Sequence, residues 1–518
     1  MQDDYVKFIR FGQWRIKNTG QGILAFITNH SYLDNPTFRG MRQSLLNSFT
    51  DIYILNLHGN VKKREVTPYG DKDENVFDIQ LGVSIGIFIK EMNKESPAKV
   101  HYADLWGDRD FKYTHLFETD INTTEWAELT PNTPFYFFVP REEKLRPEYE
   151  KGWKITEIFP VKSTGIVTAR DHFVIDFKQE QIRQRIETFL DRNLTDVEVM
   201  EKLSLTENYA WRVSKARKQL AGVKEWGSLF DKILYRPFDV RSIYYHPSVV
   251  WRTRDKVMRH ILVEENLALC VGRAGQVVGL ETWNIIFCSN QIEDFNLFYR
   301  GGNVNLPLYL YPIEGEMQFE EGRRPNINPL FIKDLSAKLG LEFISDDKGD
   351  LKKAYGPEDI FNYIYAILHS PTYRNRYAEF LKIDFPCIPL TSDLELFKAL
   401  IDKGTKIASL HLMESLVLNS LITKYPISGS DVIEKVTYDE GSRRIYINEK
   451  QYFEGVLPEI WSFHIGGFQV CQKWLKDRKG RTLNYDELAH YQKVIVALKE
   501  TIQLMADIDQ LMIGWPIK

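Results

Sequence analysis

Apolar and polar positions alternate along the first hundred residues in runs that predict short strands and one helix. The apolar run 22–28 has the form of a strand buried on both faces of a sheet. An amphipathic helix is predicted after Pro36, with Asn35 as its N-cap. The runs 51–57 and 83–89 predict two further strands. This order of strand, helix, strand, loop and strand indicates the second half of an α/β sheet.

The rest of the chain divides by pattern into three parts. Residues 101–155 are polar and aromatic, with a Pro-rich stretch and a charge run, which predicts a crossover or linker. Residues 156–345 mix short β-rich segments with one helical stretch, which predicts an α+β domain. Residues 346–518 carry apolar residues mainly at helical spacing, interrupted by a predicted hairpin at 435–447. The predicted fold is therefore a partial α/β domain over residues 1–100, an α+β domain and a mostly helical C-terminal region.

Composition and charge narrow the function classes. The chain has 518 residues, of which 43% are hydrophobic and 27% charged, as in an ordinary globular protein of about three domains. Sixty-seven basic and seventy-one acidic residues give a net charge of −4, so a contact with nucleic acid must use a local patch. No apolar run approaches the roughly 20 residues that span a bilayer, and the N-terminus lacks the order of a signal peptide. We expect a cytoplasmic protein without a membrane partner.

The cysteines indicate neither a disulfide framework nor a metal site. Cys270, Cys288, Cys387 and Cys471 are far apart, with no CxxC pair and no histidine at zinc-finger spacing. They are expected to be reduced and buried. Asp71, Asp73 and Glu74 lie in a charged loop, where they are expected to be solvated rather than to bind a metal.

Two sets of segments resemble a known family. The first resembles the latter half of the catalytic domain of adenine-specific, amino-methylating DNA methyltransferases, in particular the single-chain restriction-modification enzymes of type ISP and their type II G-like relatives. Its segments are Gly22–Leu33, Thr37–Arg42, Leu57–Asn60, Asp73–Gln80 and Gly82–Val83. The second set resembles the C-terminal target-recognition domain of the same enzymes. Its segments are Leu234–Arg241, Phe361–Pro371 with Tyr373 and Arg374, and Lys473–Arg481. The two sets follow the family's order and span nearly the whole chain.

The resemblance implies a function in DNA methylation. Family members flip an adenine out of the duplex and methylate its amino group with S-adenosylmethionine. Two of their motifs, the glycine-containing turn that binds the cofactor and the Asn/Asp-Pro-Pro-Tyr/Phe loop, are absent from the sequence. Asn35-Pro36-Thr37-Phe38 and Asn328-Pro329-Leu330-Phe331 resemble the second motif but lack its second proline.

From this resemblance we expect the chain to be the DNA-recognition half of an adenine-specific DNA methyltransferase. By family it belongs to an enzyme, but no complete catalytic set lies in this chain. We expect it not to bind S-adenosylmethionine alone and to need a missing N-terminal methyltransferase half or a separate subunit. The alternative is a non-enzymatic DNA specificity subunit that docks on a separate methyltransferase.

Three residues of the first hundred are candidates for the base-binding site. Phe77 matches the family's aromatic residue that stacks on the flipped adenine, and a core phenylalanine is the alternative. Asn29 and His30 follow the first strand, where they would face the ligand crevice of an α/β sheet. A capping or loop role is the alternative for His30, and it is favoured over a general base.

Basic residues in two patches and two loops are the candidates for contacts with double-stranded DNA. Aromatic residues are interleaved with the first patch, and Gly480 lies within the second. The candidates are Arg252, Arg254, Lys256 and Arg259, then Arg273 and Arg300 in Gly-containing loops, and Lys473, Lys476, Arg478, Lys479 and Arg481. A solvated charged face is the alternative for the last group. For Arg236 and Arg241 we favour structural roles, such as pairing with Asp239.

Overall fold

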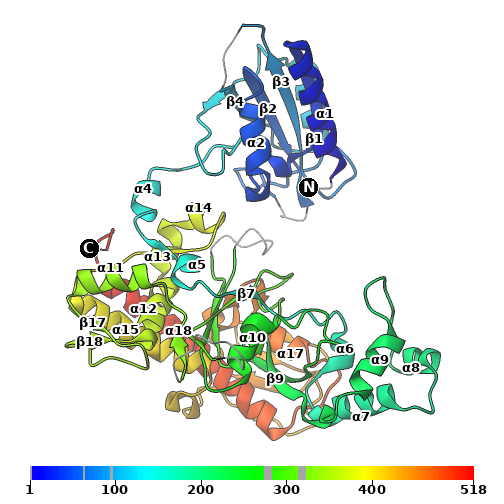
Figure 1. The fold of residues 1–518 in the computed structure, drawn as a ribbon, viewed down its shortest axis with the longest axis vertical. Coiled ribbons are helices and arrows are strands. Elements are labelled where there is room, and N and C mark those ends of the chain that lie inside the picture. Colours follow the sequence, from blue (N-terminus) through cyan, green and yellow to red (C-terminus); the bar gives the residue numbers. More distant parts are fainter. Residues whose placement is uncertain (1–2, 62–64, 94–96, 274–282, 313–321, 518) are drawn as a thin grey trace. The chain divides into compact units, whose positions relative to one another are not determined.

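The structure is a computed structural model that describes residues 3–61, 65–93, 97–273, 283–312 and 322–517 (Figure 1). In it the chain forms two compact units, Met1–Lys144 and Leu145–Lys518. Each unit has its own sheets and its own hydrophobic core.

A mixed sheet of five strands, in the order β1-β3-β2-β4-β5, is the framework of the first unit. β2 and β4 are parallel, and the other neighbouring pairs are antiparallel. The strands are β1 (Gly22–Asn29), β2 (Asp51–His58), β3 (Val83–Lys90), β4 (Lys99–Asp104) and β5 (Ala127–Leu129). The helices are α1 (Asp4–Thr19), α2 (Arg39–Leu46) and α3 (Arg109–Glu118). α1 lies along β1 (Figure 1). The absence of a side chain at Gly12 lets Leu24 pack against the helix.

The strands and the helix predicted for the first hundred residues are present, but β1 is less buried than predicted. The Asn35 cap is confirmed, because its side-chain oxygen accepts a bond of 2.9 Å from the Thr37 N–H. β1 lies at the edge of the sheet, where Ile23 is 67% and Ile27 43% exposed. The prediction of a strand buried on both faces is therefore wrong. Within the described residues, β3 is the one strand that pairs with β1.

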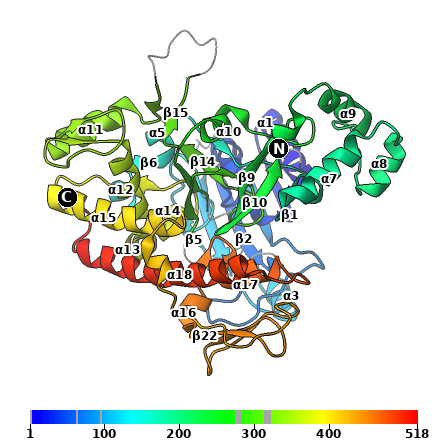
Figure 2. The same ribbon diagram turned by 90° about the horizontal axis from the view of Figure 1, so that it is seen from below.

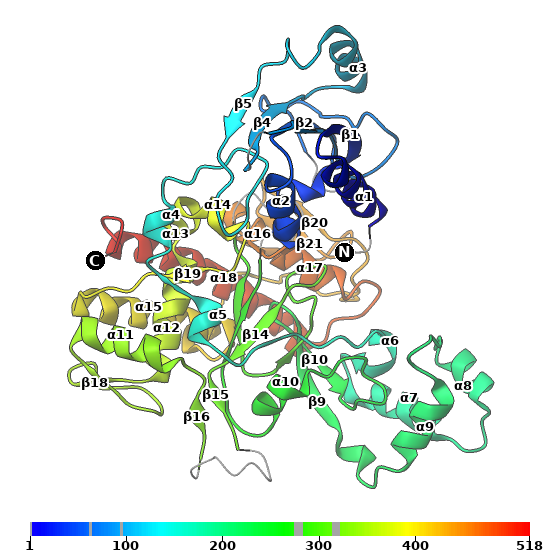
Figure 3. The ribbon, with the colours of Figure 1, turned by 45° about the horizontal axis from the view of Figure 1, so that its top comes forward.

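Residues 101–144 of the segment predicted as a linker, 101–155, contribute regular structure to the first unit. β4 extends the sheet beside β2, β5 pairs with β4, and α3 lies between them in sequence (Figure 3). β4 buries Val100 and Tyr102. Their alternation with polar residues is too short to stand out from the polar sequence around it.

Two four-stranded sheets are the largest in the second unit. Their orders are β13-β9-β10-β8 and β12-β11-β14-β7. The strands are β7 (Ser163–Thr164), β8 (Ile175–Asp176), β9 (Phe230–Arg236), β10 (Asp239–Tyr244), β11 (Ala268–Val271), β12 (Ile286–Ser289), β13 (Ile292–Glu293) and β14 (Val304–Pro307). A three-stranded sheet consists of β20 (Thr437–Asp439), β21 (Arg444–Tyr446) and β22 (Tyr452–Glu454). The described residues also form four pairs of short strands: β6 (Trp153–Lys154) with β19 (Cys387–Ile388), β15 (Tyr309–Leu310) with β16 (Arg324–Pro325), β17 (Glu342–Phe343) with β18 (Ala354–Tyr355), and β23 (His464–Ile465) with β24 (Phe468–Gln469).

The helices of the second unit fall into an N-terminal and a C-terminal set. The first comprises α4 (Arg146–Tyr149), α5 (Ile155–Ile158), α6 (Asp171–Val174), α7 (Gln179–Leu190), α8 (Asp196–Lys202), α9 (Val213–Ala221) and α10 (Asp255–Leu262). The second comprises α11 (Pro329–Leu339), α12 (Pro357–His369), α13 (Pro371–Arg376), α14 (Ala378–Leu381), α15 (Leu394–His411), α16 (Pro458–Trp461), α17 (Val470–Lys476) and α18 (Tyr485–Leu511). α7, α8 and α9 form a group at one end of the unit, whereas α15 packs between α12 and α18 (Figure 2).

The expectation of mixed helices and sheets is confirmed, and the four cysteines are buried and unpaired as predicted. The predicted helical stretch is α7–α9, and the predicted hairpin is β20–β21. The boundaries at residues 100, 155 and 345 stay predictions. Within the described ranges, none of the helices combines the length and the apolar character that a bilayer crossing requires.

Candidate nucleic-acid interface

The hairpin of β9 and β10 is the centre of a buried charge network in the second unit. Its turn contains Phe238, which has a φ of 62° and is 2% exposed. The ring of Phe238 contacts Phe287 and His411 edge-on, at centroid distances of 5.2 and 5.5 Å. The turn is thus anchored in the core, and the residues on either side of it are held in fixed positions.

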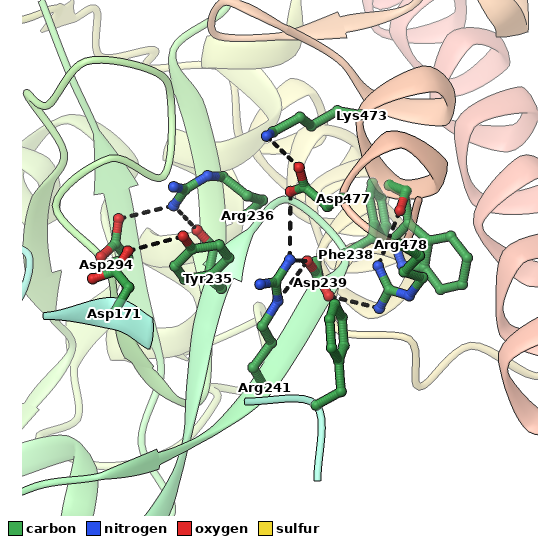
Figure 4. A network of polar contacts seen from close by, with 12 residues as sticks. Asp171, Tyr235, Arg236, Phe238, Asp239, Arg241, Asp294, Lys473, Asp477 and Arg478 are labelled. Atoms are coloured by element: carbon green, nitrogen blue, oxygen red, sulfur yellow. Dashed lines mark hydrogen bonds and ion pairs between the residues drawn. The ribbon is translucent and has the colours of Figure 1, made fainter. Parts of the chain in front are cut away.

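Asp239, directly after this turn, joins the hairpin to the segment that follows α17 (Figure 4). Its carboxylate accepts bonds of 2.7 Å from Arg478 and 2.7 Å from Arg241, and it is 1% exposed. Burial alone would raise the pKa of Asp239, but the two adjacent guanidinium groups hold it below its ordinary value. Asp239 and Arg478 are 239 positions apart in sequence, so this pair fixes the tertiary structure of the unit.

An aromatic ring completes the network. The guanidinium groups of Arg241, Arg478 and Arg481 lie over the ring of Phe177, at 4.2, 4.7 and 3.8 Å from its centroid. Arg481 also pairs with Glu487 at 3.0 Å. These contacts are cation–π pairs at short range, so they stabilise the junction of β10 with α17 and α18.

Arg478 therefore does not belong among the candidate DNA contacts. It is 4% exposed, and its guanidinium is committed to Asp239, to the Trp474 carbonyl and to Phe177. The sequence placed it in a basic run because the carboxylate that neutralises it lies far away in the chain. Lys473 is also engaged, because it pairs with Asp477 at 2.5 Å.

Arg236, at the end of β9, is part of a second buried pair. It donates to Asp294 at 2.8 Å, and it lies 3.8 Å from the centroid of the Tyr235 ring. Burial raises the pKa of Asp294 to about 6, and Arg236 opposes this shift. The structural roles that we favoured for Arg236 and Arg241 are confirmed.

The cations of the first patch have different surroundings. Arg252 and Lys256 are exposed, whereas Arg254 and Arg259 are half-buried at the start and on the side of α10. Arg254 has a φ of 58° and begins the helix. Within the described part of the chain, none of the four forms an ion pair with a carboxylate. Their charges are therefore available to an anionic partner.

Three loops that carry or adjoin predicted cations converge in the second unit. The backbone of Gly272, beside Arg273, lies against Gly302, since a Cβ at Gly272 would be 3.0 Å from the Gly302 carbonyl oxygen. Gly467 donates to the Phe298 carbonyl at 2.8 Å. Arg273 is half-buried over Phe385, and Arg300 is exposed. The fold thus brings residues 272–273, 298–302 and 466–468 together.

Lys476 and Lys479 are the exposed cations of the second patch. Lys476 ends α17, where its ammonium donates to Gln472 at 2.8 Å. Lys479 follows in a turn that Gly480 closes with a φ of 80°. Both side chains are placed where a phosphate could approach them.

In the first unit, Phe77 lies on the loop between β2 and β3. It is 42% exposed, which excludes the alternative of a core phenylalanine. Asn75 holds the loop in shape, because its side chain accepts from the Phe77 N–H at 2.9 Å and donates to the Leu81 carbonyl at 2.7 Å. Phe77 is thus an aromatic side chain presented by a segment that the bonds of Asn75 hold in place.

A buried ion pair supports the same loop. Lys112 of α3, which is fully buried, donates to Asp73 at 2.7 Å and to the carbonyl oxygens of Leu57 and Glu74. Asp73 also accepts from the Gly59 N–H at 2.6 Å. The prediction of a solvated Asp73 is wrong, because Lys112, 39 positions away, neutralises it. The sequence carried no signal for Lys112, since one lysine on a short polar helix is ordinary.

His30 and Asn29 have local roles at the end of β1. The His30 ring is 6% exposed, and its Nδ1 lies 3.1 Å from the side-chain oxygen of Asn56. Asn29 accepts from the Ser31 N–H at 2.8 Å, so it caps the turn that follows. The burial of His30 does not favour the expected position facing a ligand crevice. A structural role in the loop fits both His30 and Asn29. Among the described residues, no cluster of three or more His, Cys, Asp or Glu side chains could hold a metal ion.

Comparisons with known proteins give one family match and several structural matches. Residues 157–507 match the model of the Type ISP C-terminal specificity domain. Among solved structures, the ATP-dependent Type ISP restriction-modification enzyme LlaBIII bound to DNA superposes with a TM-score of 0.74 at 23% identity, over 100% of this chain and 34% of that one. A DrdV–DNA complex gives 0.73 at 20% identity, over 98% of this chain and 52% of that one.

A third solved structure also has a fold similar to that of this chain. It is a nuclease-deletion mutant of the Type ISP enzyme LlaGI in complex with a DNA substrate mimic, with a TM-score of 0.68 at 22% identity, over 98% of this chain and 40% of that one. No curated protein sequence matches the chain. At these identities the structural matches show the fold, and the chain spans between 34% and 52% of the length of these three proteins. The matched model covers well over half of the sequence, so the chain belongs to the Type ISP C-terminal specificity domain family.

Proposed function

We propose that this chain recognises a short sequence in double-stranded DNA and binds the target adenine for an adenine-methylating restriction-modification enzyme. The family match over residues 157–507 carries this proposal, because the specificity domain of such a system reads the DNA sequence. The three structural relatives are DNA complexes, which supports DNA as the partner.

The second unit has the chemistry for this binding. Arg252, Lys256, Arg300 and Lys479 are exposed cations without a carboxylate partner among the described residues. All four can contact phosphates, and Arg300 can also reach a base edge. The net charge of −4 means that attraction to DNA comes from these local cations. Phosphate contacts set the position of a protein on the duplex, and contacts with base edges select the sequence.

The first unit has one residue suited to a flipped adenine. Phe77 is half-exposed on a loop that Asn75 and the Lys112–Asp73 pair hold in place. An aromatic face in a fixed position replaces the stacking that an extruded base loses, at about 1–3 kcal/mol per base. We therefore propose Phe77 as the stacking residue.

Methyl transfer needs S-adenosylmethionine, and we assign its binding to another half of the enzyme. The cofactor turn and the Asn/Asp-Pro-Pro-Tyr/Phe loop are absent from the sequence, so the residues present do not form that site. The cofactor supplies the methyl group, and this chain contributes DNA recognition and base stacking.

The surface of the first unit supports a protein partner. β1 is an edge strand with exposed Ile23 and Ile27, and α1 beside it exposes Phe8, Phe11 and Trp14. An apolar strand edge of this kind pairs readily with another strand. We propose a methyltransferase half of the enzyme as that partner. The specificity-subunit alternative would use this surface to dock a separate methyltransferase, but that alternative gives Phe77 no role.

Selection from a pool of duplexes with a randomised central window tests the proposal. The chain is incubated with the pool, the bound duplexes are recovered, and the enriched sequences are read. We expect one short motif that contains an adenine. A bound pool as random as the starting pool would contradict the proposal.

A further inference from the structure

Residues 299–302, between β13 and β14, form a loop of unusual backbone conformation. Tyr299 has a φ of 104° and Arg300 a φ of 38°, and Gly301 and Gly302 follow with 90° and 91°. Glycine adopts positive φ freely, but tyrosine and arginine adopt it at a cost in stability. Four such residues in a row give the chain a tight bend with Arg300 exposed near its tip.

Another segment of the chain clamps one side of this loop. The Gly467 N–H donates to the Phe298 carbonyl at 2.8 Å, and a Cβ at Gly467 would lie 2.9 Å from the Cβ of Tyr299. A Cβ at Gly466 would lie 2.4 Å from the Phe298 carbonyl oxygen. The loop can therefore approach residues 466 and 467 only because both are glycines.

The loop is braced on its other side and at its base. Gly301 packs against the ring of Phe295, where a Cβ would lie 2.4 Å from a ring carbon. Gly272 lies against Gly302 in the same close manner. The Asn303 N–H donates to the Phe295 carbonyl at 3.4 Å and closes the bend. The backbone that carries Arg300 is thus enclosed by close contacts.

Arg300 differs from the buried arginines of the same unit. Arg236, Arg241 and Arg478 each pair with a carboxylate, whereas Arg300 forms no ion pair among the described residues. Its guanidinium lies 5.2 Å from the centroid of the Tyr299 ring. That ring is itself held edge-on by Phe468 at 5.6 Å. The contact with Tyr299 thus orients the side chain of Arg300, and its N–H donors are available to a partner.

This arrangement suits the reading of a base better than contact with a phosphate. An exposed lysine, such as Lys476 at the end of α17 or Lys479 in the turn that follows, serves for a phosphate, because that contact is largely a charge attraction. A bidentate bond to a base edge requires the donor pair in a fixed position, and the arginine fork matches the O6 and N7 acceptors of guanine. A fixed backbone under an exposed, unpaired arginine meets that requirement.

We propose that Arg300 is a specificity-determining residue, which reads one guanine in the major groove from the clamped loop 299–302. The proposal rests on the proposed function of DNA recognition. It assigns to Arg300 one position of the recognition sequence, on either strand.

The test repeats the selection from randomised duplexes with the full chain and three variants. Arg300→Gln exchanges the guanine reader for a side chain that pairs with adenine. Arg300→Ala removes the contact, and Arg252→Gln is the matched control because it removes an exposed arginine outside the loop. Thermal melting of each variant checks that the fold is intact.

We expect both Arg300 variants to lose the preference for guanine at one and the same position by about tenfold or more. Preference elsewhere in the motif should stay, and Arg252→Gln should keep the whole motif with weaker binding. An unchanged motif in both Arg300 variants would overturn the role of Arg300 and leave the proposed function standing. A wild-type chain that enriches no motif would overturn both.

Discussion

Arg478 and Lys479 are neighbours in sequence, but the fold places them in opposite surroundings. Arg478 is 4% exposed and paired with Asp239, whereas Lys479 is exposed in the turn before Gly480. From the sequence alone both belong to one basic run. The nearest pairing, Arg241 with Asp239, could be predicted because the two residues are on the same hairpin. The pairing of Arg478 could not, since it depends on how distant segments fold together.

This difference gives opposite effects for two adjacent substitutions. Arg478→Met should lower the free energy of unfolding by about 3–5 kcal/mol, because it leaves a buried carboxylate less well compensated. Lys479→Ala should leave thermal stability unchanged and reduce the log–log slope of DNA affinity against salt by about 0.9. Chemical denaturation and binding titrations at several salt concentrations measure both quantities. A stable Arg478→Met variant with a flatter salt slope would return Arg478 to the DNA contacts.

Glu293 is a fully buried acid in β13 with a strongly shifted titration. Burial raises its pKa to about 8, although Asn305 donates to its carboxylate. The folded state therefore holds a proton that the unfolded state releases near pH 4.5, the ordinary value for this group. It follows that the contribution of Glu293 to stability is full below pH 4.5 and is lost as the pH rises toward 8.

Glu293→Gln removes this titration and keeps the side-chain shape. Between pH 4.5 and 8, the free energy of unfolding of the variant minus that of the wild type should rise by up to about 1.4 kcal/mol per pH unit. Denaturant unfolding of both proteins at a series of pH values measures the difference. A difference that does not depend on pH would show that Glu293 is ionised in the folded protein.

At the scale of elements, the sequence predicts some strands and helices but not their positions in the sheets. The long apolar periodicity of α12 and α18 and the hairpin β20–β21 could be read from local pattern. The place of β1 at a sheet edge could not, because an apolar run reads the same at an edge as in the centre of a sheet. The order β1-β3-β2 depends on pairing between strands that are far apart in sequence.

The exposed edge of β1 predicts association of the isolated chain. Ile23→Lys should reduce concentration-dependent association, because a charge on an edge strand discourages pairing with a second strand. Leu330→Lys on α11 is the matched control, since Leu330 is 65% exposed but lies on a helix. Sedimentation over a range of concentrations gives the association state. A wild-type chain that stays monomeric at high concentration would contradict this expectation.

The loop of Phe77 allows stacking to be separated from folding. Phe77→Ala should barely change the melting temperature, because the ring is 42% exposed. In an enzyme reconstituted with a methyltransferase half, methylation should fall by about one to two orders of magnitude, as expected for a loss of about 1–3 kcal/mol. Phe77→Trp should restore part of the rate by supplying another aromatic face.

Ile79→Ala is the matched control for Phe77→Ala, since Ile79 is an exposed apolar residue of the same loop. Fluorescence of 2-aminopurine at the target position reports whether the base is extruded. A large loss of stability in Phe77→Ala, with unchanged base extrusion, would contradict stacking.

At the scale of the whole molecule, the net charge of −4 does not show that the cations fall into two groups, one buried and paired and the other exposed. Buried arginines such as Arg236 and Arg478 are neutralised by partners within the fold, so they do not attract DNA. Exposed cations such as Arg252 and Lys479 remain for the partner. Family membership thus supports the proposal that this surface binds DNA locally.

The most direct test of this account compares affinities for two duplexes at about 0.15 M salt. One carries the motif enriched by selection, and the other carries the same bases in scrambled order. We expect the chain to bind the selected duplex at least about a thousandfold more tightly, as sequence-specific DNA-binding proteins do. Equal affinities for the two duplexes would contradict the claim that this chain recognises a DNA sequence.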